Sequence, residues 1–257
     1  MSLLTLVSAH GSPGVTTTAL ALAATWPEPR RCLLVEADPF GGVIAARFGL
    51  GDTPGLSTLA AQTRGGFDDA AVEAHIQRLP GGLPVLVGPP SPEEAQAVWR
   101  DVAGPLADWA ADGSLDVIVD RGRLLPGVPP NRAPSDKDLV LVVARPTVDQ
   151  LRLASIRHAA LVAAGFDASL VLVGDRPYGP DEVATTMRVP VLGVVAWDPR
   201  TAAALTGAQG TVRDLRRSPL VRSAATLAER LAAKPEPDLV DPSGVDAATE
   251  PVEGVVG

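Results

Sequence analysis

Short apolar runs alternate along the chain with longer segments in which apolar residues recur at helical spacing. Several of the short runs contain no polar residue, a pattern typical of strands buried on both faces of a parallel sheet that helices cover. Strands that alternate with helices imply right-handed βαβ crossovers. We therefore expect an α/β fold of three layers, α/β/α, in which a mostly parallel, twisted sheet carries helices on both faces. The expected strands span residues 3–7, 33–35, 83–87, 117–119, 139–143, 170–173 and 191–195.

Capping residues mark several helix starts. Ser91 with Glu94, and Thr147 with Gln150, have the spacing of capping boxes, in which two side chains satisfy backbone amides of the first turn. The stretch 121–136 carries four prolines and two glycines, a composition that suits either a functional loop or a plain connection. The expected helices span residues 16–26, 91–110, 147–164 and 220–233.

The charge of the chain is concentrated at one end. Residues 235–257 hold six acids, four prolines and no base, so they account for six of the eight net negative charges and leave −2 for the rest. We expect one domain in residues 1–233 and an acidic, proline-containing, disordered tail in residues 234–257. The nearly neutral body gives no case for nucleic-acid binding, and the acidic tail argues against binding to an anionic membrane surface.

Cysteine usage and hydropathy bear on the compartment. Cys32 is the only cysteine of the 257 residues, which rules out an intrachain disulfide and suits a reducing cytosol. Its apolar surroundings in sequence indicate a buried core thiol. The N-terminus lacks the pattern of a signal peptide, and no apolar run approaches the roughly 20 residues that span a bilayer. We therefore expect a cytoplasmic protein without a transmembrane segment.

A glycine-rich segment, His10-Gly11-Ser12-Pro13-Gly14-Val15-Thr16-Thr17-Thr18, follows the first expected strand and opens the first expected helix. In that place a glycine-rich turn directs backbone N–H groups at an anion, and the helix N-terminus adds partial positive charge. A threonine at the helix start is a ligand for Mg²⁺ in such loops. The candidate nucleotide-binding residues are Gly11, Ser12, Pro13, Gly14, Val15, Thr16 and Thr17.

This segment resembles the deviant Walker A motif of the MinD/ParA family of P-loop ATPases, which reads K-G-G-x-G-K-T-T. Gly11 and Gly14 match glycines of the motif, and Thr16 and Thr17 match the pair that serves Mg²⁺ and phosphate. The order and spacing of the other segments follow the family over about residues 1–233. The resemblance implies a P-loop NTPase-like fold, ATP and Mg²⁺ as cofactors, and a homodimer.

The loop departs from the family at its charged positions. His10 stands at the signature lysine, Val15 stands at the P-loop lysine, and Ser12 replaces a glycine. The whole chain has two lysines, Lys137 and Lys234, and both are far from the loop in sequence. Because a charge-assisted contact is worth roughly 1.5–3 kcal/mol, we expect weak nucleotide binding and weak or absent hydrolysis. The alternative is an inherited turn without a ligand.

Acidic residues at the ends of two further strands match the family's pattern. Glu36 and Asp38 stand at its D-x-D stretch, where the second acid orients the attacking water, so the resemblance makes Asp38 the catalytic candidate. Asp120 ends a strand that resembles Walker B. The resemblance thus implies a Mg²⁺ site formed by Thr16, Asp38 and Asp120. The basic residues of the segment 121–123, which depart from the family, are interpreted as surface groups, with a contribution to the site as the alternative.

Two functions remain open at this point. The first is a MinD/ParA-like nucleotide-binding switch or positioning protein, of the kind found in chromosome partitioning or in pilus and secretion systems. The second is a nucleotide-free pseudo-ATPase scaffold that acts through an unidentified protein partner. The segment 171–176 has no Asn, the residue that often reads adenine in the family, so the base is not assigned. A dinucleotide-dependent oxidoreductase is disfavoured because a G-x-G-x-x-G segment is missing.

Overall fold

The computed structural model describes residues 3–11, 13–62, 67–112, 115–125, 127–130, 134, 138–207 and 215–233. The expected disordered tail, residues 234–257, lies outside the described residues, as does Ser12 of the glycine-rich loop. The division into a domain and a tail therefore stays a prediction.

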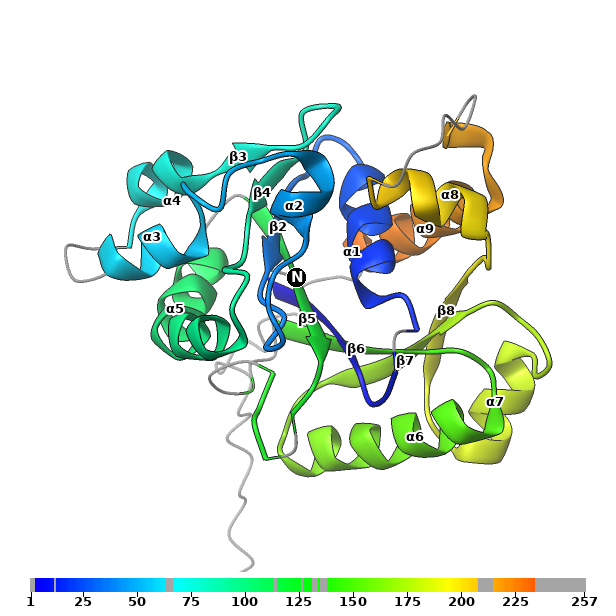
Figure 1. The fold of residues 1–257 in the computed structure, drawn as a ribbon. Coiled ribbons are helices and arrows are strands. Elements are labelled where there is room, and N and C mark those ends of the chain that lie inside the picture. Colours follow the sequence, from blue (N-terminus) through cyan, green and yellow to red (C-terminus); the bar gives the residue numbers. More distant parts are fainter. Residues whose placement is uncertain are drawn as a thin grey trace, which may run out of the picture.

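Eight strands form one sheet in the order β3-β4-β2-β5-β1-β6-β7-β8 (Figure 1). Every neighbouring pair is parallel except β3 and β4, which are antiparallel at one edge. The α/β fold expected from the apolar runs is confirmed. The strands are β1 (Leu3–Ser8), β2 (Arg31–Glu36), β3 (Gln77–Arg78), β4 (Pro84–Leu86), β5 (Leu115–Arg123), β6 (Asp138–Ala144), β7 (Ala168–Val173) and β8 (Val191–Val195).

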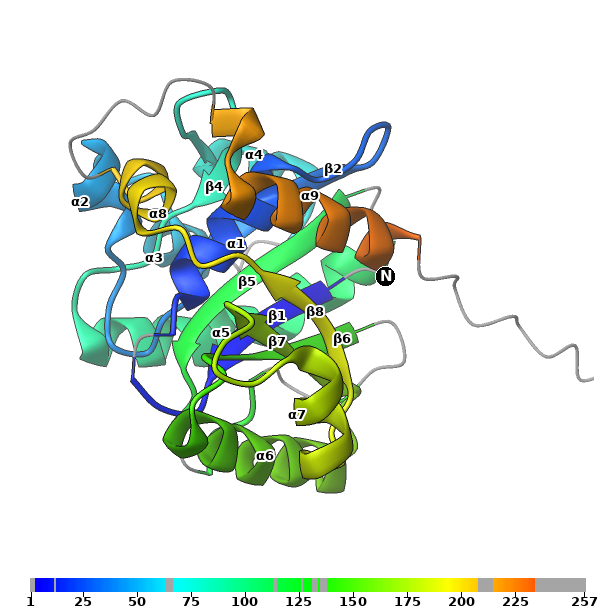
Figure 2. The ribbon, with the colours of Figure 1, turned by 90° about the vertical axis from the view of Figure 1, so that its right-hand side faces the viewer.

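Helices cover both faces of this sheet and make the expected three layers. On one face α1 and α9 pack together, α1 against β1, β2 and β5 and α9 against β8, with α2 and α8 beside them (Figure 2). On the other face α3, α4 and α5 cover β2 and β5, and α6 and α7 cover β6 and β7 (Figure 1). The helices are α1 (Val15–Ala24), α2 (Ile44–Phe48), α3 (Leu56–Gln62), α4 (Asp69–His75), α5 (Pro92–Asp112), α6 (Val148–Ala163), α7 (Pro180–Met187), α8 (Pro199–Leu205) and α9 (Pro219–Ala232).

The central strand β1 shows why apolar runs without alternation predicted this fold. All six of its residues are buried. Leu4 and Leu6 pack in the core on the α1 side, whereas Leu3 packs in the core on the α5 side. Cys32 of β2 is buried as well, and burial followed by the nearby Asp116 raises the pKa of its thiol to about 12, as expected of an inert core cysteine.

Two local predictions need correction. The segment 121–123 is not part of a loop, because β5 continues to Arg123 and pairs with the end of β1. Thr147 does precede α6, but its side chain makes no cap hydrogen bond. Gln150 instead accepts a bond from the backbone N–H of Arg145, one turn before the helix. The capping residue Ser91 is confirmed, since its hydroxyl accepts the N–H of Glu94 at 3.2 Å.

The parallel arrangement brings the carboxyl ends of β1, β2 and β5 to one edge of the sheet. Asp120 of β5 is level with Leu6 of β1 on one side and with Glu36 of β2 on the other. Ligands of open α/β sheets bind at this edge.

Among the described residues no helix is long and apolar enough to cross a membrane.

Candidate functional site

A cavity of about 450 Å³ lies at this edge, between the glycine-rich loop and the segment that follows β2. It contains most of the residues proposed from the sequence for nucleotide binding, together with Asp38. The structure thus brings together segments that are more than a hundred residues apart in sequence. The lining residues are Ser8, Gly11, Pro13, Gly14, Val15, Thr16, Thr17, Asp38, Phe40, Val43, Arg47, Gly122 and Arg123.

The glycines of the loop have the backbone conformations that a tight turn into a helix requires. Gly11 has φ 64° and Gly14 has φ 111°, values that residues with a side chain rarely adopt. Gly14 is the N-cap of α1, and the described residues make no side-chain cap hydrogen bond there. Amides of the first turn of α1 are therefore left to bind another acceptor, and the helix dipole favours an anion there.

The first turn of α1 supplies one apolar and two hydroxyl side chains to the cavity. Val15 is 5% exposed and packs in the core on the α1 side, and the residue also lines the cavity. Thr16 and Thr17 are partly buried and line the cavity. The position of the P-loop lysine is thus occupied by a side chain that contributes packing and no charge.

Asp120 is a buried carboxyl with one unused oxygen. Its Oδ1 accepts the N–H of Gly122 at 3.0 Å, whereas its Oδ2 has no hydrogen-bond partner among the described residues. Burial, with the charges of Glu36 and Asp38, raises the pKa of Asp120 to about 7, and the Thr16 hydroxyl and the Gly122 amide lower it less. A buried oxygen without a partner next to other acids is the arrangement that a bound cation would satisfy.

Asp38 lies in the cavity and packs against the end of β5. Its Oδ1 accepts the N–H of Phe40 at 2.8 Å. Burial raises its pKa, while the Phe40 amide and the positive charges of Arg121 and Arg123 act in the opposite direction. Gly122 has φ 51°, and a Cβ at that position would overlap the Asp38 carboxylate. A glycine at 122 is therefore needed to let Asp38 approach the strand.

Glu36 has a structural role. Its Oε1 accepts the N–H groups of Val43 at 2.6 Å and Ile44 at 2.8 Å, and its Oε2 accepts that of Gly88 at 3.0 Å. It is 1% exposed and does not line the cavity. These contacts hold the start of α2 against the sheet.

The interpretation of the arginines of the segment 121–123 as surface groups is wrong for Arg121, whereas Arg123 is exposed as expected. Arg121 is 2% exposed, lies 4.8 Å from the ring centroid of Trp99, and donates hydrogen bonds to the carbonyls of Ala37 and Pro130. Its aromatic and carbonyl partners explain how a strand accommodates a buried guanidinium. Arg123 is exposed to solvent but lines the cavity.

Arg47 is a cavity residue that the sequence analysis missed. It lies in the last turn of α2, nine positions after Asp38 in the sequence. No motif marks it, because its place depends on how Glu36 anchors the start of α2. Arg123 was expected to be a surface group, with a role in the site only as the alternative, because the strand that contains it was expected to end at residue 119.

The residues at the cavity fit a magnesium ion that is bound together with a phosphate chain. Thr16 and Asp38 line the cavity, whereas Asp120 is buried, does not line it, and accepts the N–H of Gly122, which does. A hydroxyl on Thr16 and carboxylate oxygens on Asp120 and Asp38 are the hard oxygen ligands that Mg²⁺ prefers. Within the described part of the chain, no three His, Cys, Asp or Glu side chains form a metal-binding group of their own. Mg²⁺ bound here would therefore depend on oxygens from water and phosphate, as is usual for nucleotide-bound Mg²⁺.

A second cavity, of about 740 Å³, lies at the same edge over β6, β7 and β8. The guanidinium of Arg145 stacks on the ring of Trp197, with 3.9 Å between the guanidinium carbon and the ring centroid. Val173 lines this cavity, and its Cγ2 lies 4.0 Å from where a Cβ on Gly14 would be. The two cavities are therefore neighbours across the glycine-rich loop. Trp197, 53% exposed, offers an aromatic face that the sequence analysis did not consider.

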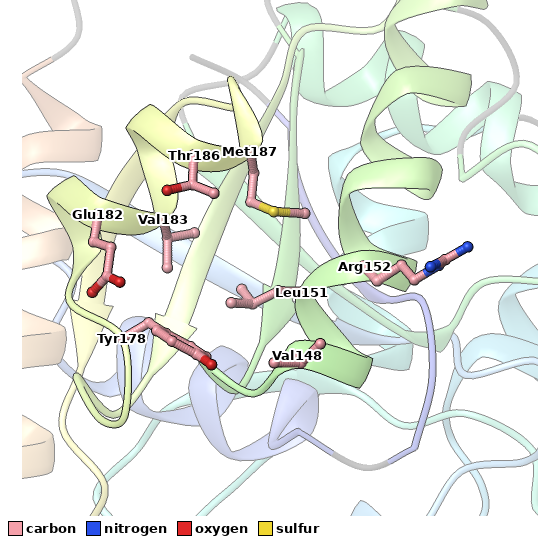
Figure 3. A pocket seen from close by; sticks show the side chains of 8 residues that line it. All are labelled: Val148, Leu151, Arg152, Tyr178, Glu182, Val183, Thr186 and Met187. Atoms are coloured by element: carbon pink, nitrogen blue, oxygen red, sulfur yellow. The ribbon is translucent and has the colours of Figure 1, made fainter.

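A third cavity, of about 290 Å³, lies between α6 and α7. Leu151, Val183 and Met187 contribute apolar side chains to it, and Arg152 points away (Figure 3). Its lining has few polar groups with which to hold a phosphate or a metal, so it does not compete with the first cavity for the predicted chemistry.

Comparison with known proteins supports the fold. No protein-family model matches the chain, and no curated protein matches its sequence. Among solved structures, the cell-division ATPase MinD of Pyrococcus furiosus aligns with a TM-score of 0.71 at 21% identity, over 90% of this chain and 99% of its own. A ParA family ATPase of Chlorobium tepidum aligns with a TM-score of 0.70 at 19% identity, over 89% and 98% of the two chains. MinD of Pyrococcus horikoshii, in complex with Mg-ADP, aligns with a TM-score of 0.67 at 19% identity, over 90% and 96%.

These likenesses extend over nearly the whole of each solved chain, although the identities are low. The chain therefore has the fold of the MinD/ParA ATPases, and the resemblance indicated by the sequence is confirmed at that level.

Proposed function

We propose that the chain is a MinD/ParA-like nucleotide-binding switch or positioning protein that binds Mg²⁺ and a nucleotide at the glycine-rich loop. The observation that carries this proposal is the convergence, in one cavity, of the uncapped N-terminus of α1, the Thr16 hydroxyl and the Asp38 carboxylate. The unused oxygen of Asp120 adds an acceptor for a cation beside them. An anion-binding helix end next to cation-binding oxygens suits a metal-bound phosphate better than either ion alone.

The proposal assigns a role to each part of the site. Backbone amides of Gly11 and of residues 14–17 would hold the phosphates, and Thr16 and Asp120 would hold Mg²⁺, with Asp38 beside it. The neighbouring cavity, with the exposed ring of Trp197, has room for a nucleoside. A bound Mg²⁺ would neutralise part of the phosphate charge. That one structural neighbour, MinD of P. horikoshii, is a complex with Mg-ADP supports the same ligand class here.

Hydrolysis of ATP is expected to be weak or absent. Asp38 is the residue that we assign to orienting the attacking water. Val15, however, places no charge where a P-loop lysine would stabilise the transferred phosphate. Positioning and electrostatic stabilisation make up most of phosphoryl-transfer catalysis. Steady turnover at an ordinary kinase or ATPase rate, abolished by Asp38→Ala, would contradict this part of the proposal.

The second candidate is a nucleotide-free scaffold that acts through a homodimer or an unidentified protein partner. The observation that favours it is the packing of the loop itself, since Pro13 and Val15 are both buried. A loop that closes on its own side chains does not need a ligand for its shape. The cytoplasmic location expected from the sequence suits both candidates.

Thermal unfolding with nucleotides separates the two candidates. A ligand that binds only the folded state stabilises it by about 2.7 kcal/mol at a hundredfold excess over Kd, which is several degrees in Tm for a domain of this size. We expect Mg-ATP or Mg-ADP at millimolar concentration to raise Tm, with the same nucleotide in EDTA as the control. No shift with ATP, ADP or GTP in the presence of Mg²⁺ would support the scaffold instead.

A further inference from the structure

The cavity at the glycine-rich loop contains cations that the loop itself does not provide. His10 and Val15 stand where the resemblance places lysines. Two arginines, Arg47 and Arg123, nevertheless line the same cavity as Gly14 and the first turn of α1. They come from different elements, the end of α2 and the end of β5. Positive charge is therefore present at the site, but it reaches the site from the side opposite the loop.

Arg123 is held in place by an aromatic ring. Its guanidinium carbon lies 4.4 Å from the ring centroid of Phe40. The backbone of Phe40 is tied to the Asp38 carboxylate, and Arg123 lowers the pKa of that carboxylate. Stacking on a ring leaves the edge of a guanidinium, with its N–H donors, free to bind an anion in a forked geometry. Arg123 is thus oriented before any ligand arrives.

Arg47 is held through its backbone at both ends of its short helix. Glu36 accepts the amides of Val43 and Ile44 at the start of α2. At the other end, Gly207 packs so closely on the Arg47 carbonyl that a Cβ there would overlap it. The main chain of Arg47 is therefore fixed at a place where the residue lines the cavity. Fixed attachment reduces the entropy lost when such a side chain binds an anion.

The order of the strands indicates which part of a bound nucleotide would lie near Arg47 and Arg123. The cavity with the exposed Trp197 lies over β6, β7 and β8, on one side of β1. Arg47 and Arg123 lie on the other side of β1, toward β2 and β5. A nucleotide whose base lies near Trp197 and whose phosphates cross the N-terminus of α1 would bring its terminal phosphates toward the two arginines.

We propose that Arg47 and Arg123 bind the terminal phosphates of a nucleoside di- or triphosphate, and that they replace the charge of the missing loop lysines. This inference rests on the proposed nucleotide binding and adds the side chains that hold the terminal phosphates. Arginine suits the role because its planar fork matches phosphate oxygens and because it stays charged. A nucleoside monophosphate would not reach the pair, so affinity should increase from mono- to di- to triphosphate.

The test is isothermal titration of the full chain with Mg-ATP, Mg-ADP, AMP and magnesium tripolyphosphate. We expect Arg123→Gln and Arg47→Gln each to weaken Mg-ATP binding about tenfold or more, the low end expected for a lost charge-assisted contact. AMP binding should not change. Arg123→Lys, which keeps the charge and loses the fork, should give an intermediate affinity. Arg31→Gln is the matched control, because exposed Arg31 begins β2 at the opposite edge of the sheet.

The outcomes separate this inference from the proposed function. Two results would overturn the arginine role and leave nucleotide binding in place. In the first, both glutamine variants and the control weaken Mg-ATP binding equally. In the second, none of the three variants changes Mg-ATP binding. If the chain binds tripolyphosphate but no nucleotide, and the arginine variants lose tripolyphosphate, the arginine role stands and the proposed nucleotide function falls. If the chain binds neither ligand, both fall.

Discussion

Replacement of Asp120 by Asn should stabilise the metal-free protein at neutral and alkaline pH. The carboxyl is 1% exposed, and its Oδ2 has no hydrogen-bond partner among the described residues. Burial, and to a smaller extent the charges of Glu36 and Asp38, raises its pKa. Asparagine has nearly the same shape and keeps an oxygen for the N–H of Gly122. It carries no charge that burial penalises or that repels the neighbouring acids.

The size of the effect follows from the pKa. A rise of the Asp120 pKa from 3.8 to about 7 lowers the free energy of unfolding by up to about 4 kcal/mol, because a change of one pKa unit is worth about 1.4 kcal/mol. Between these two values the folded state binds more protons than the unfolded state, so the free energy of unfolding of the parent falls as pH rises and becomes level above about pH 7. The advantage of the variant should therefore be close to zero below pH 4 and largest near pH 8.

The assay is urea unfolding of the parent and Asp120→Asn in EDTA, at pH 8 and at pH 5. The variant should be more stable at pH 8 by up to about 4 kcal/mol, and more than half of that difference should vanish at pH 5. Addition of Mg²⁺ should stabilise the parent more than the variant. A variant that is less stable than the parent at pH 8, or a difference that does not change with pH, would refute the reasoning.

Three further predictions concern the loop, β5 and the tail. Gly122→Ala should displace Asp38 and destabilise the fold by about 1–3 kcal/mol, measured by urea unfolding, whereas Gly81→Ala, also at positive φ but with nothing within 4 Å, should cost less. Val15→Lys should strengthen nucleotide binding about 10- to 150-fold in calorimetric titration if the new ammonium reaches the phosphates, and no gain in a folded variant would favour the scaffold. Truncation after Lys234 should leave Tm nearly unchanged in calorimetry, and a loss of several degrees would show that the tail packs on the domain.

The architecture could be predicted from the sequence because the strands are apolar on both faces. Leu3 and Leu4 of β1 both read as core, and a strand with two buried sides has its place only inside a covered sheet. The glycine-rich loop could also be predicted, because a glycine-rich turn between a strand and a helix is a local feature of the sequence. Its residues are adjacent in the chain, and their spacing alone carries the signal.

The cations of the site were not found because nothing local marks them. Arg121 and Arg123 follow an acid and flank a glycine, a pattern that favours a surface turn. The ring of Trp99, from α5, is what stabilises Arg121 in the interior, and that contact is tertiary. Arg47 reaches the cavity only because Glu36 anchors α2 on the sheet. Side chains that converge from separate elements cannot be assigned from spacing in one sequence.

The central claim is that the glycine-rich loop binds a magnesium nucleotide, and equilibrium titration of the chain with a fluorescent ADP in Mg²⁺ tests it most directly. The account predicts saturable binding at one site per chain, competed by unlabelled ADP, and lost in Gly14→Val, since a side chain at φ 111° strains the loop and obstructs the phosphates. Circular dichroism would verify that the variant is folded. No binding to the parent, or equal binding to the folded variant, would contradict the claim.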